Sequence, residues 1–240
     1  MSLRTEYDTW HEHVFLSDTA HDDTSSPWYL WVSQSIRNLS GMRTLEVACG
    51  RGGFVRKLSR TSAFSCGVDF SYAAVSISSQ RWRESNHTPA PFIQGDAQAL
   101  PFPDESFDVL VSCETIERLP SPEVAVREFY RVTRPGGLLY LTTPNYFNFM
   151  GLYELYAKFR HPNRAPDQPY DRIQLFFQTR RLLRSAGWKI LSCDGTVHQF
   201  PFFPGRNPVR IKQLESVRSL RKLLSVFAFT YCVIAQKEPR

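Results

Sequence analysis

Residues 45–53 have the sequence LEVACGRGG, and this stretch decides the fold. It begins within a short apolar run, Thr44–Cys49, that predicts a buried strand. Small residues at positions 48, 50 and 52 then let the backbone turn sharply and approach a ligand without a side-chain clash. Because the N-terminus of the following helix can face a carboxylate, the stretch predicts a strand–loop–helix unit that binds a ligand.

Farther from this stretch, apolar runs alternate with helical stretches along the chain. Ser71 precedes a predicted helix at Tyr72–Glu84, Ser121 with Pro122 starts another at Val124–Val132, and a third covers Thr179–Ala186. The alternation predicts a single α/β domain over residues 1–240, with right-handed crossovers. The first five strands are almost continuously apolar, as expected for parallel strands covered on both faces. Seven runs predict the strands: Thr44–Cys49, Phe64–Phe70, Pro91–Asp96, Phe107–Cys113, Gly137–Thr142, Trp188–Asp194 and Phe229–Gln236.

The composition agrees with one domain in a reducing compartment. Of the 240 residues, 42% are hydrophobic, which is enough for a buried core. No apolar run approaches the roughly 20 residues of a membrane span, and we expect no signal peptide. The five cysteines form no CxxC pair, so we expect small core residues in a cytoplasmic protein rather than disulfides or zinc ligands.

The charge is distributed unevenly along the chain. Residues 1–145 carry 13 Lys and Arg against 17 Asp and Glu, a net charge of −4. Residues 146–240 carry 16 against 6, a net charge of +10. The basic part could face an anionic partner, although a solvated surface that uses arginine explains the same numbers.

Three segments depart from the alternation. Residues 1–40 are rich in aromatic residues and predict helices that cap the ligand pocket, unless these side chains only pack on the sheet. Residues 145–178 form a long insertion with many aromatic side chains, and we expect it to face the substrate. Residues 197–226 place apolar residues at helical spacing with basic residues mostly beside them, which predicts a basic amphipathic helix over 206–222. That helix could pack on the sheet or dock on anionic lipid at a membrane surface.

Asp69, at the end of the second predicted strand, indicates a ligand that contains a ribose. A carboxylate about 20 residues after such a loop can accept hydrogen bonds from both ribose hydroxyls. Dinucleotide-binding folds share this arrangement, and Ala48-x-Gly50-x-x-Gly53 resembles a degenerate form of their fingerprint. Asp69 alone therefore does not distinguish NAD from S-adenosylmethionine (SAM).

Two further stretches carry a resemblance to a known family. Residues 95–112 read GDAQALPFPDESFDVLVS, and residues 129–145 read FYRVTRPGGLLYLTTPN. Both resemble class I SAM-dependent methyltransferases, particularly the small-molecule group (methyltransferase type 11, similar to the O-methyltransferases of ubiquinone biosynthesis). The resemblance covers residues 44–145 and resumes at 177–193 and 229–237. It implies a Rossmann-like, seven-stranded, mostly parallel sheet with an antiparallel last strand and helices on both faces.

The resemblance also implies SAM as the cofactor and S-adenosylhomocysteine as the product. Asp69 would hold the ribose, with Phe70 beside the adenine. Asp96 and Ala97 would hold the adenine, and Cys113 would flank the methyl group. In similar enzymes an early tyrosine, here Tyr7, covers the cofactor. The methionine part of SAM would lie against Glu46, Ala48, Gly50 and Gly52, where Ala48 replaces the first loop glycine of the family.

The segment after the fourth strand is not expected to hold a metal. Residues 113–120 resemble the ExxEH segment of ubiquinone-biosynthesis O-methyltransferases and small-RNA 2′-O-methyltransferases, which in the RNA enzymes supplies metal ligands. Here Arg118 stands in the histidine position, and a guanidinium cannot coordinate a cation. We expect Glu114 and Glu117, three residues apart, to share a helical face near the transferred methyl group, unless they only pair with Arg118 or serve as charges at a helix start.

The sequence does not single out a catalytic base. An oxygen nucleophile benefits from a group that takes its proton, and the candidates are Glu117, His161 and His198. The candidate substrate contacts are Tyr146, Arg160 and Arg172 in the insertion, with the arginines suited to a phosphate or carboxylate.

We therefore expect methyl transfer to a small-molecule acceptor, most simply to a hydroxyl of a sugar, a quinone-like ring or a secondary metabolite. One alternative is a lipid-linked acceptor methylated at a membrane surface, which implies peripheral membrane contact. Another is a relative that binds SAM, a nucleotide or RNA without catalysis. A nucleic acid is not the expected partner, because the loop after the fourth strand lacks the Asn/Asp-Pro-Pro-aromatic sequence of nucleic-acid amino methyltransferases.

Overall fold

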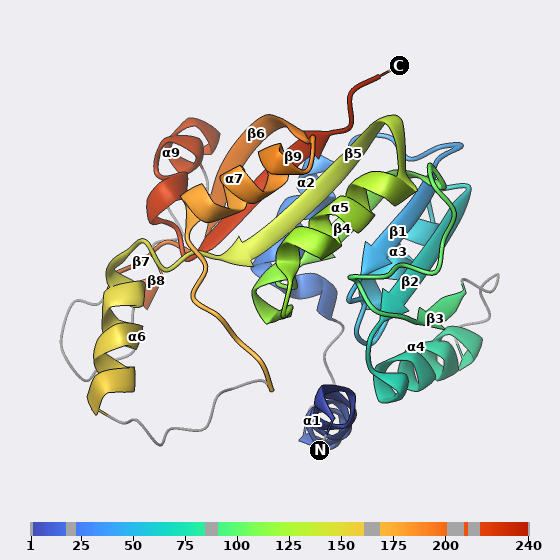
Figure 1. Cartoon of the computed structure of the whole chain (residues 1–240), viewed down its shortest axis with the longest axis horizontal. Helices are drawn as coiled ribbons and strands as arrows, with labels where there is room; N and C mark the ends of the chain where they lie inside the picture. Colours follow the sequence, from blue (N-terminus) through green and yellow to red (C-terminus); the bar gives the residue numbers. More distant parts are fainter. Residues whose placement is uncertain are drawn as a thin grey trace.

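The protein is built around one seven-stranded sheet. The computed structural model describes residues 2–17, 23–84, 91–160, 169–200, 209–210 and 217–239. The strands follow the order β3-β2-β1-β4-β5-β9-β6 across the sheet (Figure 1). They are β1 (Arg43–Val47), β2 (Phe64–Asp69), β3 (Phe92–Gln94), β4 (Phe107–Cys113), β5 (Thr133–Pro144), β6 (Lys189–Thr196) and β9 (Thr230–Gln236).

The direction of the strands confirms the predicted Rossmann-like sheet. Strands β3, β2, β1, β4 and β5 pair in parallel. Strand β9 runs antiparallel to both of its neighbours, β5 and β6. All seven predicted strands are present, with ends that differ by a few residues. The longest change is in β5, which begins at Thr133 because Gly136, at a φ of 78°, turns the chain without ending the strand.

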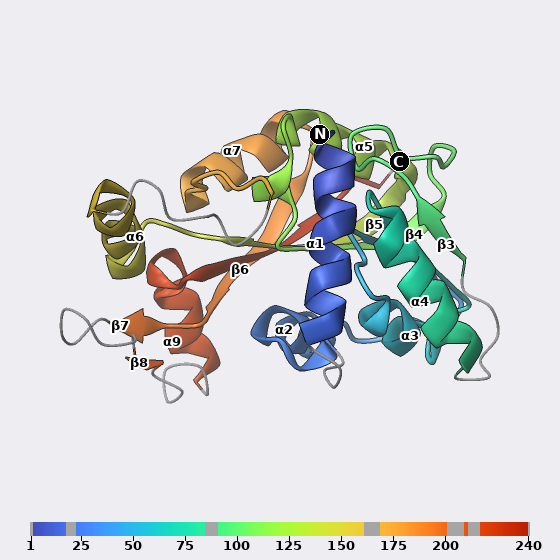
Figure 2. The ribbon, with the colours of Figure 1, turned by 90° about the horizontal axis from the view of Figure 1, so that it is seen from below.

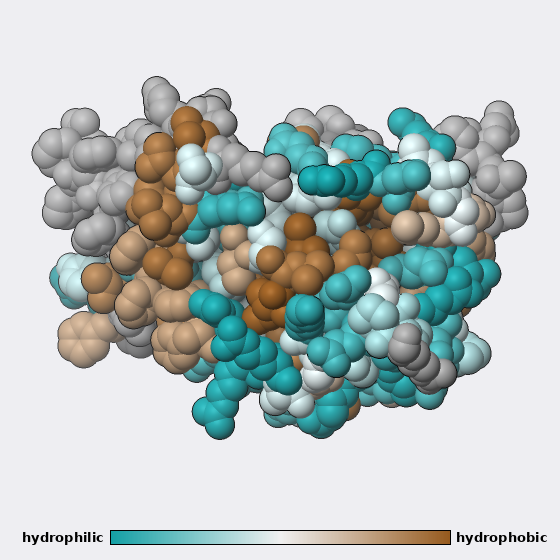
Figure 3. Space-filling view, turned by 90° about the horizontal axis from the view of Figure 1, so that it is seen from above, coloured by the Kyte–Doolittle hydropathy of each residue, from teal (hydrophilic) through white to brown (hydrophobic). Residues whose placement is uncertain are grey.

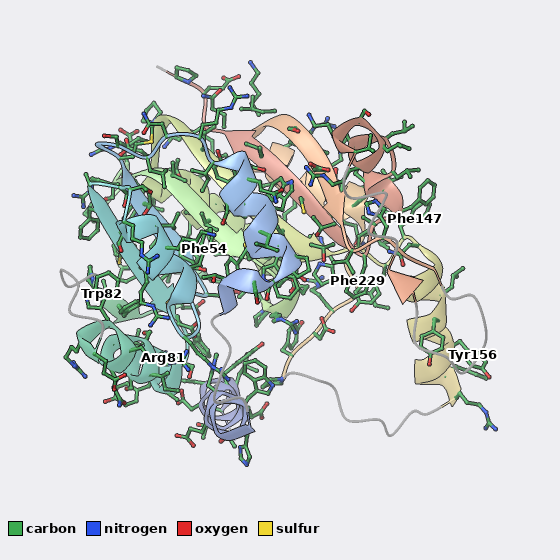
Figure 4. All side chains as sticks on the ribbon, turned by 180° about the vertical axis from the view of Figure 1, so that it is seen from behind. Phe54, Arg81, Trp82, Phe147, Tyr156 and Phe229 are labelled. Atoms are coloured by element: carbon green, nitrogen blue, oxygen red, sulfur yellow. The ribbon has the colours of Figure 1, made fainter. Side chains whose placement is uncertain are left out.

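Helices cover both faces of the sheet. On one face lie α5 and α7, and on the other lie α2 and α3, with α4 beside β3 (Figure 1). Along β4 the side chains alternate between these layers, so Leu110 packs with α5 and α7 whereas Val109 and Val111 pack with α2 and α3. Figure 4 shows Phe54 of α3 on this second face. The longer helices are α1 (Leu3–Ser17), α2 (Pro27–Ser35), α3 (Gly53–Ser59), α4 (Tyr72–Glu84), α5 (Pro122–Val132), α6 (Phe149–Arg160), α7 (Phe176–Ser185) and α9 (Arg218–Leu223). Three short 3-10 helices are η1 (Asp23–Ser25), η2 (Ile116–Arg118) and η3 (Ser225–Phe227).

The predicted starts of α4 and α5 are confirmed in position but differ in chemistry, whereas α7 begins at Phe176, three residues before the predicted Thr179. Ser71 caps α4 through its side chain, since its Oγ accepts a hydrogen bond from the Ala74 backbone N–H at 3.1 Å. Ser121 precedes α5 without a side-chain cap, and Pro122 fills the first turn.

The insertion before β9 only partly forms the expected helix. Val209–Arg210 is a strand, β8, which pairs with β7 (Gln199–Phe200), whereas α9 begins at Arg218. Val209 is β-branched, and such residues have a lower helix propensity and a higher strand propensity, which opposes one continuous helix over 206–222. Helix α9 packs on the sheet, because Arg221 forms an ion pair with Asp194 of β6 at 3.0 Å. Asp194 also accepts a hydrogen bond from Trp31 Nε1 of α2 at 3.1 Å.

The first insertion leaves the sheet after β5 and forms α6, which stands apart from the sheet (Figures 1 and 2). Asn145, fully buried, fixes its start by donating hydrogen bonds to Val226 O at 2.7 Å and Ala228 O at 3.1 Å. Figure 4 places Tyr156 on the detached α6 and Phe147 nearer the body of the protein, where its ring lies 5.5 Å from the ring of Phe176. In the described residues, no helix is both long and apolar enough to cross a membrane.

Candidate active site

The carboxyl ends of the central strands surround one cavity of about 360 Å³. Its walls come from the ends of β1, β2 and β4, the turn after β3, and the helices α1 and α2. This is the edge at which parallel α/β sheets bind their ligands, because the chain leaves each strand there in an adjustable loop. Seen from below, α1 lies across this edge of the sheet (Figure 2).

The loop after β1 has an unusual backbone that suits close approach of a ligand. Ala48, Gly50 and Gly52 all have positive φ, at 59°, 49° and 73°. A Cβ added to Gly50 would meet only His11 Cε1, at 4.0 Å, so the backbone there faces open space. A Cβ added to Gly52 would lie 2.7 Å from the Phe92 ring. Gly50 therefore leaves room in the cavity, and Gly52 allows the loop to pack on β3.

Asp69 is nearly buried at the end of β2, and its carboxylate faces the loop. Oδ2 accepts a hydrogen bond from the Gly50 N–H at 2.8 Å, and Oδ1 accepts one from the Ser71 N–H at 2.9 Å. Each carboxylate oxygen has a further lone pair, so Asp69 can accept two ribose hydroxyls while it holds the loop in place.

The turn after β3 supplies a second carboxylate. Asp96 Oδ1 accepts hydrogen bonds from the backbone N–H and the side-chain Nε2 of Gln98, at 2.8 and 3.1 Å. Gln98 Oε1 in turn accepts the Ser121 N–H at 2.9 Å, which ties the turn to the start of α5. Together with Ala97, Asp96 and Gln98 line the cavity and offer it a hydrogen-bond acceptor for an adenine amino group.

Helix α1 covers the cavity and is anchored by Asp8. Asp8 Oδ1 accepts hydrogen bonds from Ser71 Oγ at 2.6 Å and from the Ala73 N–H at 3.2 Å, at the N-terminus of α4. Tyr7 then faces the cavity, with its ring 6.4 Å from the ring of Phe70. Burial raises the pKa of the Tyr7 phenol to about 12, so the hydroxyl stays protonated.

Two glutamates, Glu114 and Glu117, follow β4, and only the first lines the cavity. Glu117 is fully buried outside the lining, where Oε2 accepts a hydrogen bond from Thr143 Oγ1 at 3.0 Å and Oε1 lies 3.4 Å from Arg118 Nε. The expectation that they share a helical face is wrong, because η2 begins only at Ile116 and Glu114 has a φ of 50°.

Most of the predicted cofactor residues come together at the cavity. Eight of them line it: Tyr7, Ala48, Gly50, Asp69, Phe70, Asp96, Ala97 and Cys113. Two do not, namely Gly52 and Glu46, whose carboxylate accepts a hydrogen bond at 2.8 Å from the lining residue Tyr29. Their roles in binding stay predictions.

The candidate catalytic and substrate residues are placed mostly away from the lining. His198 is buried after β6, and His161 lies outside the described residues. Arg160 is exposed at the end of α6, and Tyr146 packs near Phe229, with ring centroids 6.2 Å apart. Arg172 is exposed too, although its backbone N–H donates to Glu117 O at 3.0 Å, close to the cavity.

The sequence did not single out His11, Gln98 and Arg118 as lining residues. His11 lies four residues after Tyr7, so the two side chains share one face of α1, and the helical period predicts that both face the cavity. Gln98 and Arg118 reach the cavity through turns whose side-chain directions follow no periodic pattern.

The residues present fit SAM. The cavity combines a loop without side chains at Gly50, a carboxylate with free acceptor capacity at Asp69 and a second one at Asp96. Burial keeps the thiol of Cys113 protonated by raising its pKa, which leaves an uncharged wall at the end of β4. In the part of the chain that the structure describes, no three His, Cys, Asp or Glu residues gather as a metal set. That a metal is not needed stays a prediction.

The strand order, with the cavity at the carboxyl ends of its strands, matches the Rossmann-like fold of methyltransferases. A family model described as a methyltransferase domain matches residues 45–141, which contain the loop, Asp69, Asp96 and Glu114. This segment of the chain is therefore a methyltransferase domain.

Relatives and solved structures agree with this class. A probable phthiotriol/phenolphthiotriol dimycocerosates methyltransferase 2 of Mycobacterium ulcerans is 44% identical over 103 residues, which cover 42% of this chain and 38% of the relative. A fatty-acid O-methyltransferase of Mycolicibacterium smegmatis is 38% identical over 107 residues, which cover 44% of this chain and 38% of the relative. The match thus spans about two fifths of either relative. A SAM-dependent methyltransferase structure from Thermotoga maritima shares the fold over 99% of this chain and 100% of that chain, with a TM-score of 0.66 at 19% identity.

Proposed function

We propose that this chain transfers a methyl group from SAM to a hydroxyl oxygen of a small-molecule acceptor. The observation that carries the proposal is Asp69, a carboxylate with free acceptor capacity beside the glycine loop, at the carboxyl end of a parallel sheet. When bound, SAM supplies an electrophilic methyl group on a sulfonium sulfur. The domain family and the methyltransferase relatives support the same reaction class.

In this proposal the chain's own residues bind, orient and exclude water. Asp69 accepts the ribose hydroxyls, Asp96 accepts the adenine amino group, and the loop from Ala48 to Gly52 borders the methionine part. Helix α1 covers the cavity through Tyr7, which keeps water away from the reacting groups. The strand order β3-β2-β1-β4 then leaves the end of β4 as the acceptor side, because β2 and β3 carry the nucleoside carboxylates.

A lipid-linked acceptor, reached at a membrane surface, is the second candidate. Its support is a group of exposed apolar side chains on α6 and α9, among them Phe159 at 87% exposure and Leu223 at 75%. Figure 3 shows hydrophobic side chains gathered at the end of the molecule that carries α9. The two relatives, a phthiotriol/phenolphthiotriol dimycocerosates methyltransferase and a fatty-acid O-methyltransferase, act on lipids.

An acceptor screen tests both candidates. Purified protein is incubated with methyl-labelled SAM and matched sets of phenols, sugars, fatty acids and long-chain lipid alcohols, and label in the acceptor is counted. We expect uptake by a hydroxyl-bearing class, with the alcohols above the corresponding acids. SAM binding without uptake by any class would contradict catalysis, and uptake by acids alone would contradict the hydroxyl acceptor.

A further inference from the structure

Glu114 lies at the end of β4 and lines the cavity. It directly follows β4, and its backbone N–H continues the ladder by donating to Thr142 O at 2.9 Å. Its φ of 50° lies in the left-handed region, which is costly for a residue with a side chain. This backbone directs the side chain into the cavity lining rather than along η2.

One oxygen of the Glu114 carboxyl, Oε1, is buried and left without a hydrogen-bond partner among the described residues. Leaving a buried acceptor unpaired is unfavourable, so such groups are typical of binding and catalytic sites. Burial and then the nearby Glu117 raise the pKa of this carboxyl well above its ordinary value of 4.5.

The neighbouring glutamate, Glu117, does not line the cavity. Its Oε2 accepts a hydrogen bond from Thr143, and its Oε1, which also has no hydrogen-bond partner in the described part of the chain, lies 3.4 Å from the Arg118 guanidinium. Arg118 also donates from Nε to the Glu114 backbone O at 3.2 Å, so it fixes the turn that presents Glu114. Among the two carboxylates, Glu114 is therefore the one with free acceptor capacity in the cavity.

We propose that Glu114 is the catalytic base that takes the proton of the acceptor hydroxyl, an inference that depends on the methyl transfer proposed above. The hydroxyl oxygen forms the new bond to carbon while its proton passes to Glu114 Oε1. The electron pair of the broken carbon–sulfur bond stays on sulfur, and the proton later leaves Glu114 to solvent. Glu114 lies beyond β1 from the carboxylates of β2 and β3, on the side assigned to the acceptor.

Other titratable groups near the cavity bear on this assignment. Glu114 interacts electrostatically with four of them, namely Glu117 and Arg118 of η2, Asp171 of the segment before α7, and Cys232 of β9. The lining residue His11 is the competing base. It lies on α1 beside Gly50, on the side assigned to the methionine part.

Replacement of the carboxyl by an amide tests the chemistry. Glu114→Gln should lower kcat about 100-fold, the lower end of general-base contributions, with an unchanged affinity for SAM. The wild-type rate should rise with pH as Glu114 loses its proton, and the variant should lack this rise. Glu123→Gln, an exposed residue of α5, is the matched control. An active Glu114→Gln enzyme with the wild-type pH profile would overturn the inference and leave the proposed function intact.

A stability measurement tests the same inference without any acceptor. Because the folded-state pKa of Glu114 is raised, the folded protein is destabilised as pH rises above 4.5 through that pKa. Glu114→Gln removes this effect, so its Tm at pH 8 should exceed that of the wild type by about 2–4 °C. A Tm lowered at pH 8 would show that the carboxylate is paired and structural, and would overturn the proposal even if no acceptor is found.

Discussion

Ala48 has a left-handed backbone at the point where the family's first loop glycine is expected. Its φ of 59° destabilises the folded state by about 1–2 kcal/mol, because the residue has a Cβ. Glycine would remove this strain, but its more flexible unfolded chain would offset part of the gain in stability. Ala48→Gly should therefore raise the free energy of unfolding by about 0.5–1 kcal/mol. Urea unfolding of the two proteins measures this difference.

Gly52 provides the opposite case in the same loop. Its φ is 73°, and an added Cβ would lie 2.7 Å from the Phe92 ring and 2.9 Å from Ser78 Cβ. Gly52→Ala should lower the free energy of unfolding by about 2 kcal/mol or more, because both strain and overlap are introduced. If both substitutions changed stability in the same direction, the assigned backbone of the loop would be wrong.

At this scale the sequence predicts residues that end strands better than residues in turns. Asp69 could be placed because an apolar run defines where β2 ends, whereas Asp96, in the turn after β3, is placed by the resemblance of residues 95–112 to the methyltransferase family. Glu114 and Glu117 could not be told apart, since their directions depend on a left-handed residue before a 3-10 helix rather than on a helical period. His198, the histidine candidate within the described residues, is buried next to Val197, whose φ of 60° is likewise not predictable from a periodic pattern.

Among the elements, α1 has the clearest link to binding. It is joined to α4 through Asp8, whose carboxylate accepts two hydrogen bonds there. Asp8→Ala should weaken SAM binding about tenfold, since a hydrogen bond to a charged group contributes about 1.5–3 kcal/mol and only part of it positions Tyr7. Titration calorimetry measures the change.

Glu12→Ala is the matched control on α1, because Glu12 is exposed on the same helix. It should bind SAM as the wild type does. Equal affinity of the Asp8 variant and the wild type would mean that α1 does not cover the bound cofactor.

Helices and strands were predictable where a single pattern of apolar residues continues over the whole element. Strands with continuous apolar runs and helices with a Ser start could be recognised locally. The region 197–226 could not, because two-residue strands such as β7 and β8 are too short to show a period. The pairing of α9 with β6 through Arg221 and Asp194 is a contact between distant segments, which a helical pattern does not reveal.

On the scale of the whole molecule, the basic part of the sequence also contains the exposed apolar side chains of α6 and α9. Residues 146–240 carry the net charge of +10, and they contain the exposed Phe159 and Leu223. If this part contacts anionic membranes, the protein should sediment with anionic vesicles, less so at high salt, and not with neutral ones. Leu223→Ser and Phe159→Ser should reduce the bound fraction severalfold.

Tyr72→Ser is the control for this experiment, since Tyr72 is 65% exposed on α4, at the opposite end of the molecule (Figure 1). Loss of vesicle binding in this control alone, or equal binding to neutral vesicles, would contradict a membrane-facing role of α6 and α9. Binding that all variants share would place the contact elsewhere.

The central claim is that the cavity at the carboxyl ends of the strands binds SAM through Asp69. It is tested most directly by calorimetric titration of SAM, S-adenosylhomocysteine and NAD into the wild type, Asp69→Ala and the exposed control Asp104→Ala. We expect dissociation constants on the order of micromolar for the first two ligands, no response to NAD, and at least about a 100-fold loss in Asp69→Ala only. Binding of NAD alone, or unchanged SAM affinity in Asp69→Ala, would contradict the account.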